Sequence, residues 1–130
     1  MMMKYLIRWG DYAGMTASGI CLVHCVAMPF LLAAFPMLGL GHEHDSVHSL
    51  LVLGVTIPVV VALLPGFIKH REPVALLLGA AGLAAFMVAV YVVGPLFGQA
   101  WETALAICSS LLLIIAHRRN HGNCKSCASD

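Results

Sequence analysis

The stretch that decides the fold is VALLLGAAGLAAFMVAVYVV, residues 74–93, which contains no charged residue. An α-helix needs about 20 predominantly apolar residues to cross the hydrocarbon core of a bilayer, so this stretch fits one span. Three further apolar stretches cover approximately residues 12–40, 47–68 and 101–116. Strand-like alternation is absent, and only helices or closed barrels satisfy their backbone polar groups inside lipid. The sequence therefore predicts an all-α integral membrane protein with four transmembrane helices.

The composition supports a membrane protein and excludes other classes. Hydrophobic residues make up 61% of the 130 residues and charged residues only 10%, whereas soluble domains have about 45–50% and about 25%. A chain this short has too little interior to hide so many apolar side chains, which excludes a soluble globular protein, and its hydrophobicity excludes a disordered one. The net charge of +1 offers no basic surface for nucleic acid.

The basic residues predict the orientation. The connections at residues 41–48 and 94–100 contain no lysine or arginine, and all seven basic residues lie on the other side of the predicted spans: Lys4, Arg8, Lys69, Arg71, Arg118, Arg119 and Lys125. The positive-inside rule therefore places both termini in the cytoplasm. We expect a multi-pass protein of the bacterial inner membrane, with a transmembrane domain at residues 1–117 and a cytoplasmic tail at residues 118–130.

The first predicted span carries a set of soft metal ligands. Cys21 and Cys25 are four residues apart and His24 is three residues from Cys21, so the three side chains are close neighbours on a helix, with Cβ atoms about 5–6 Å apart. A disulfide needs Cβ atoms about 3.5–4.5 Å apart, so the thiols are better placed to share a metal. Thiolates and imidazole suit soft or borderline metal ions, and an ionisable residue inside a span suggests function.

Two further groups of candidate ligands flank the spans. The predicted external loop contains His42, His44 and His48 together with two acids, which indicates a capture site for a divalent cation or, alternatively, a solvated polar loop. The tail contains Cys124-x-x-Cys127 with His117 and His121 upstream. These four nitrogen and sulfur donors suit zinc and softer ions. The same cysteine spacing also serves redox sites, and the tail residues having no role is a third alternative.

The motifs together resemble the MerC family of small inner-membrane mercury-resistance proteins, over nearly the whole chain. The stretch SGICLVHCVAMP, residues 18–29, resembles the first helix of MerC-domain proteins outside mercury operons, and Ala116-His117 followed by Asn120 resembles the end of their fourth helix. The resemblance implies transport of mercuric ion into the cytoplasm, where a mercuric reductase would receive it.

The identity of the metal is left open by the ligand set. Mercury-operon members of the family carry Cys-x-x-Cys in the first helix, whereas this chain has three residues between Cys21 and Cys25. Mercuric ion prefers two thiolates, and added imidazoles and carboxylates shift a donor set towards zinc or a similar ion. The divalent ion is expected as transported substrate, with no resident cofactor.

Three functional classes can be weighed on these residues. The first is a metal importer, not an enzyme, that works by ligand exchange from the external loop through the first span to the tail. The second is a membrane thiol–disulfide oxidoreductase, which the predicted cytoplasmic position of both tail cysteines disfavours. The third is a haem-binding bundle, which would need facing histidines deep in the spans, where only His24 lies. Four short helices provide little protein to surround an ion pathway through the bilayer, so assembly as a homodimer is also considered.

Overall fold

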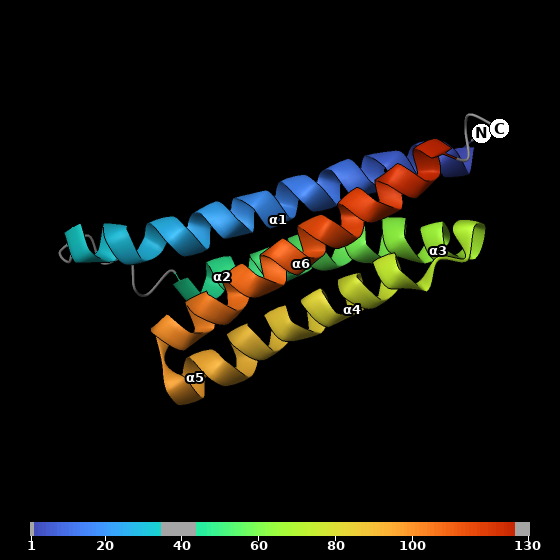
Figure 1. Cartoon of the computed structure of the whole chain (residues 1–130). Helices are drawn as coiled ribbons and strands as arrows, with labels where there is room; N and C mark the ends of the chain where they lie inside the picture. The colour runs from blue at the N-terminus through green and yellow to red at the C-terminus, as the bar shows by residue number, and fades with distance from the viewer. Residues whose placement is uncertain (1, 35–43, 127–130) are drawn as a thin grey trace.

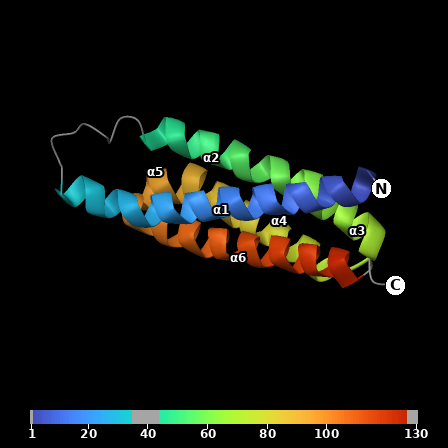
Figure 2. The same ribbon diagram turned by 90° about the horizontal axis from the view of Figure 1, so that it is seen from above.

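The computed structural model describes residues 2–34 and 44–126, which form a bundle of four long antiparallel helical rods (Figures 1 and 2). The first rod is α1 (Met2–Ala34) and the last is α6 (Gln99–Ser126). The second consists of α2 (His44–Pro58), the π-helical segment η2 (Val59–Leu63) and α3 (Leu64–His70). The third consists of α4 (Pro73–Val88), the π-helical segment η3 (Ala89–Val93) and α5 (Gly94–Phe97).

The predicted all-α fold is confirmed, and the described residues contain no strand. Three helical segments are long and apolar enough to cross a membrane, namely Ser49–His70, Pro73–Phe97 and Gln99–Asn123. The N-terminal helix α1 completes the bundle and packs most extensively against α6. Because α1 has 33 residues, it is about 50 Å long and extends beyond the thickness of a hydrocarbon core.

The helices at both ends of the chain are longer than the apolar stretches predicted. Helix α1 begins at Met2, about ten residues earlier than expected, because Lys4 and Arg8 lie on its exposed face and do not interrupt it. Helix α6 continues through the proposed domain boundary at residue 117 as far as Ser126. Residues 118–126 of the predicted tail therefore extend the fourth helix.

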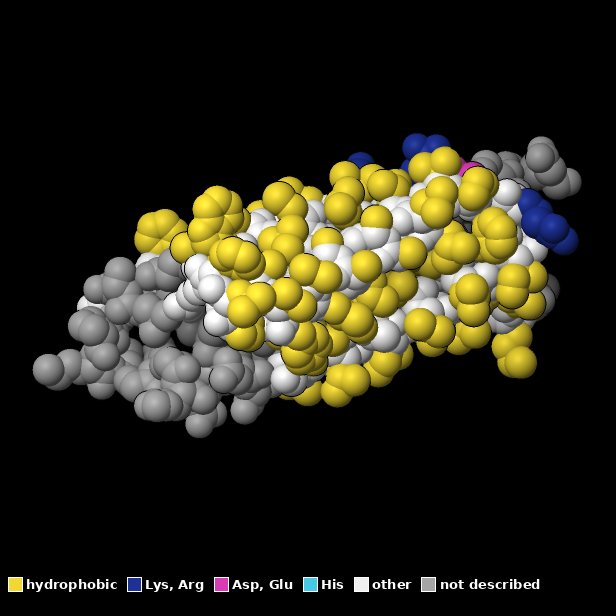
Figure 3. Space-filling view, turned by 90° about the horizontal axis from the view of Figure 1, so that it is seen from below, with side chains coloured by type: hydrophobic (Ala, Val, Ile, Leu, Met, Phe, Trp, Pro, Cys, Tyr) yellow, Lys and Arg dark blue, Asp and Glu magenta, His cyan; other side chains and the backbone are white. Residues whose placement is uncertain are grey.

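The two chain ends lie at the same end of the bundle, next to α3 (Figure 1). Lysine and arginine side chains gather towards this end, whereas hydrophobic side chains cover the length of the bundle (Figure 3). This arrangement agrees with an even number of spans and with a basic side facing the cytoplasm. We call the end of the bundle that carries the two chain ends the basic end, and the opposite end, where α5 and α6 meet, the outer end.

Each π-helical segment is followed by a proline, with one residue between them. Pro65 follows η2 and Pro95 follows η3, and each is the second residue of the next α-helix. Proline has no N–H to donate, and its ring collides with the carbonyl group four residues earlier in a regular α-helix. The wider π turn relieves that collision without ending the helix, so both rods continue across their prolines.

Two tight turns join the last three rods. Arg71 adopts a left-handed conformation, with φ of 55°, and its N–H donates to the carbonyl of Phe67 at 2.8 Å, which ends α3. Glu72 is extended and Pro73 starts α4. At the outer end Gly98, with φ of 88°, donates its N–H to the carbonyl of Gly94 at 3.0 Å and turns the chain into α6.

The arrangement of the ends gives a test of topology. A reporter enzyme that works only in the cytoplasm should be active when it is fused after Asp130, because the basic end carries both termini. A reporter that works only on the opposite side of the membrane should be active when it is inserted between residues 41 and 48. Finding both reporters on one side would contradict the four-span arrangement.

Candidate metal centre

The candidate site lies in the interface between α1 and α6. Every third or fourth residue of α1 from its second turn onward is buried there, which is the spacing of one helix face. This buried stripe consists of Ile7, Asp11, Gly14, Ser18, Cys21 and Cys25. Small residues in the stripe allow close helix approach, as is common in membrane bundles. The stripe brings the two cysteines into the interior of the bundle.

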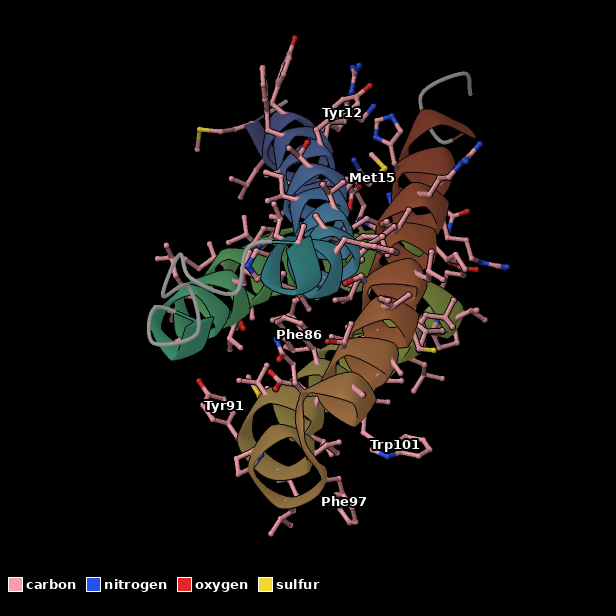
Figure 4. All side chains as sticks on the ribbon, turned by 90° about the vertical axis from the view of Figure 1, so that its left-hand side faces the viewer. Tyr12, Met15, Phe86, Tyr91, Phe97 and Trp101 are labelled. Atoms are coloured by element: carbon pink, nitrogen blue, oxygen red, sulfur yellow. The ribbon has the colours of Figure 1, made fainter. Side chains whose placement is uncertain are left out.

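The two thiols are buried and adjacent. Cys21 is fully buried and Cys25 is 4% exposed, and their sulfur atoms are 3.9 Å apart. Both belong to a cluster with Phe86 and Ala106, and Figure 4 shows Phe86 directed into the middle of the bundle. The side chain of Ser110 on α6 interacts with Cys21. Both cysteines are free thiols, so the pair can take up a metal ion without prior reduction.

The sulfur separation defines what the pair can hold. With metal–sulfur bonds of about 2.3 Å, an ion bridging sulfurs 3.9 Å apart has a sulfur–metal–sulfur angle of about 116°. A linear arrangement would need sulfurs about 4.6 Å apart with the same bond length. The pair therefore fits a bent bridge as it stands and needs a small movement to hold an ion linearly.

His24 does not join the thiols in a common cluster. It is half-buried and lines a groove on the side of α1 with Thr16, Gly19 and Val23. Successive residues of an α-helix are about 100° apart, so His24 is turned well away from Cys25. Among the side chains that the structure describes, no three histidine, cysteine or acidic groups lie close enough to hold a metal ion together.

The other predicted ligands lie partly outside the described residues. His42 and Cys127 fall outside them, and so do the side chains of His44, His48 and Cys124. Along the backbone, His44 is the first residue of α2 and His48 follows four residues later, so the second helix begins early enough for both to occupy one face. The capture loop and the tail site remain predictions.

His117 belongs to the bundle interior rather than to an exposed tail. Its side chain is fully buried, and its Nδ1–H donates to Oδ1 of Asp11, also fully buried, at 3.0 Å. His121 is also buried, and its ring lies 4.9 Å from that of Tyr12 on α1. Both predicted tail histidines therefore contribute to packing between α1 and α6.

Asn120 completes a buried polar network with Asp11 and His117. The Asn120 amide donates to both carboxylate oxygens of Asp11 at 3.0 Å and to the carbonyl oxygen of Ala62 in η2 at 3.2 Å. The network thus joins α1, α6 and the second rod. Two glycines make room for it, because a side chain at Gly14 would collide with the His117 ring and one at Gly66 with the Asn120 amide.

Sequence reasoning missed Asp11, which lies directly before the predicted start of the first span at about residue 12. The signal was its spacing. Asp11 lies seven residues before Ser18, which itself lies seven before Cys25, and a seven-residue spacing keeps side chains on one helix face.

Glu102 is the second acidic residue missed by sequence reasoning. It lies in the first turn of α6 at the outer end and is only 8% exposed. Its carboxylate packs where a side chain at Gly94 would otherwise be. The third described acid, Glu72, is at the basic end, where it accepts hydrogen bonds from Arg119 at 3.0 and 3.2 Å and from Asn123. Two of the three described acids are thus buried.

The buried network predicts a large stability effect. Asn120→Ala removes the donors to Asp11 and leaves a buried carboxylate undersatisfied, which should cost about 3 kcal/mol of unfolding free energy. The measurement is unfolding of the purified protein in mild detergent by increasing amounts of sodium dodecyl sulfate. Asn123→Ala is the matched control on the same helix, because its partner Glu72 is only partly buried, and it should cost less than about 1 kcal/mol. Equal effects of the two variants would contradict the role given to the network.

Comparison with known proteins supports one family. A family model described as MerC mercury resistance protein matches residues 11–122. The match extends from Asp11 through the thiol pair to the end of the Asp11–His117–Asn120 network. Comparisons with curated proteins and with solved structures found no match.

Proposed function

The chain belongs to the MerC mercury resistance family, and from this membership we propose that it carries mercuric ion across the membrane into the cytoplasm by ligand exchange between thiols. The observation that supports the proposal most directly is the buried thiol pair, with sulfur atoms 3.9 Å apart in a helix bundle built to span a bilayer. The proposed role is transport and not catalysis.

The charge of the cargo explains why a thiol pair is needed. A free divalent cation cannot be moved into a low-dielectric interior without a large desolvation cost. When two thiols bind the ion they lose their protons, so a dication bound to two thiolates is formally neutral. Cys21 and Cys25 can therefore hold mercuric ion inside the bundle at no net charge.

The remaining steps involve the ends of the proposed pathway. The external loop with His42, His44 and His48 collects the ion, and Cys124 with Cys127 accept it on the cytoplasmic side. A mercuric reductase is the proposed cytosolic receiver. We place the protein in the bacterial inner membrane with its basic end in the cytoplasm. We also propose that the protein assembles as a homodimer, because a single bundle of four helices provides little protein to surround an ion pathway.

Zinc is the alternative cargo, and the donor count favours mercury over it. Zinc sites in proteins are almost always four-coordinate, but the described side chains around Cys21 and Cys25 provide no third histidine, cysteine or acidic ligand. Mercuric ion needs only the two thiolates. The sulfur spacing of 3.9 Å fits a bent bridge, so a small opening of the pair accompanies linear binding.

The thiol pair gives the first functional test. Cys21→Ser and Cys25→Ser should each reduce mercury accumulation by cells at least tenfold, because serine keeps the size of the side chain but not the thiolate. Cys108→Ser is the matched control, since Cys108 is exposed. Cells with this variant should accumulate mercury like the wild type. The measurement is uptake of radioactive mercuric ion. Equal loss in all three variants would show that these cysteines matter only for packing.

His24 separates the two candidate metals. A mercuric site made of two thiolates should bind the ion equally well in His24→Ala and in the wild type. A zinc site that recruits the imidazole should lose at least tenfold in affinity, because four donors are needed. Competition titrations of the purified protein with each metal measure both affinities. A large loss of mercury binding in His24→Ala would contradict the two-thiolate site.

A further inference from the structure

Glu102 occupies an unusual place for a carboxylate. It is 8% exposed at the outer end of α6, within a helix otherwise apolar enough to cross a membrane. Acidic side chains inside spans are rare and generally mark ion pathways. An acid in the first turn also complements the helix dipole, but this effect does not require the side chain to be buried. The position of Glu102, buried within a span, therefore makes it a candidate for a role in ion passage.

Two features of the fold fix the place of the carboxylate relative to the thiol pair. First, Glu102 is one helical turn from Ala106, which packs in the same cluster as Cys21 and Cys25. Because four residues rise about 6 Å along a helix, Glu102 lies one turn to the outer side of that cluster. Second, the absence of a side chain at Gly94 leaves the space that its carboxylate group fills.

The charge of Glu102 acts on the Cys25 thiol. Helix α1 runs from the basic end to the outer end (Figure 1), so Cys25 lies one turn nearer the outer end than Cys21. The same end carries the exposed aromatic residues Phe97 and Trp101, which point away from the bundle (Figure 4). Glu102, Cys25 and Cys21 thus follow one another from the outer end inward.

We propose that Glu102 is an outer cation site that guides mercuric ion onto Cys25 and neutralises the intermediate in which only Cys25 is bound. This inference rests on the proposed transport function and adds to it a residue and an order of binding. The described residues form no three-ligand metal site, so the carboxylate acts before the two-thiolate complex forms and is not part of it.

The charge balance shows where the carboxylate is needed. Mercuric ion arriving with two neutral ligands, such as water or imidazole, carries two positive charges. When the Cys25 thiol loses its proton to water and its sulfur displaces one ligand, the bound ion retains one positive charge. When Cys21 does the same and displaces the second ligand, the complex becomes neutral and a second proton is released. Glu102 supplies the one negative charge that matches the singly bound state, where Coulomb attraction in a low-dielectric site is strong.

The experiment uses the full chain with Cys108, Cys124 and Cys127 replaced by serine, so that Cys21 and Cys25 are the only thiols. Stopped-flow absorbance of the thiolate–mercury charge-transfer band measures loading by mercuric nitrate in detergent micelles. Glu102→Gln should slow loading at least tenfold while the final stoichiometry stays at one ion per pair. Gly94→Ala should slow loading similarly, because the added methyl group displaces the carboxylate without removing its charge.

Matched controls separate this effect from a general disturbance. Glu72→Gln removes an acid at the basic end, and Gly54→Ala adds a methyl group where no atom lies within 4 Å; both should load like the parent protein. The order of binding is tested by adding Glu102→Gln to proteins with one remaining thiol. It should slow mercury binding to Cys25 when Cys21 is serine and have little effect on Cys21 when Cys25 is serine.

The outcomes distinguish this inference from the function on which it rests. If the parent protein loads one ion per thiol pair but Glu102→Gln loads equally fast, the role of Glu102 is wrong and the thiol site stands. An equal slowing of both single-thiol proteins would overturn the order of binding. If the parent protein does not bind mercuric ion at the pair, the proposed transport function fails together with this inference.

Discussion

A carboxylate buried in a helical bundle must receive its hydrogen bonds from neighbouring helices, and the way Asp11 meets this constraint fixes much of the structure. Its partners His117 and Asn120 both come from α6, and Asn120 also reaches the second rod through Ala62. These contacts fix both the depth and the rotation of α1 against α6. Because Cys25 lies fourteen residues, or two heptads, after Asp11, the rotation that buries Asp11 also buries the thiols.

The third rod contributes to the site through its irregular end. The π turn before Pro95 lets the helix continue to Gly94 and α5, and Gly98 then reverses the chain. This return places the first turn of α6 against the backbone at Gly94, which is where the carboxylate of Glu102 lies. The proline and the two glycines together thus determine where the carboxylate of Glu102 lies.

The sequence was sufficient for the fold because the physical signal is strong and local. Long apolar stretches separated by polar connections can satisfy their backbone in lipid only as helices, and this prediction needed no knowledge of packing. The thiol pair was also found, since residues four apart on a helix are neighbours in any fold. The position of His24 was harder to predict, because a rotation of about 100° separates a side chain in the helix interface from one in a lateral groove.

The acids were missed for a different physical reason. Asp11 and Glu102 lie near the ends of apolar stretches. From the sequence alone, a charged residue at such a position can equally well lie at the membrane surface or in the interior of the protein. Only the packing of α1 on α6, and the absence of side chains at Gly14 and Gly94, makes these positions interior ones. Such information is tertiary, and the same is true of His117, whose partner is 106 residues away.

The charges of the bundle also bear on how an ion would leave it. The described basic residues lie towards the end that carries the termini (Figure 3), so a free dication emerging there would be repelled by the surrounding lysines and arginines. A mercuric ion held by two thiolates is neutral and meets no such barrier. Release as a free ion is therefore disfavoured, whereas direct exchange from one pair of thiolates to another keeps the charge at zero. In the transport cycle proposed above, the basic end that orients the protein in the membrane would therefore also favour delivery of the ion to a thiol acceptor.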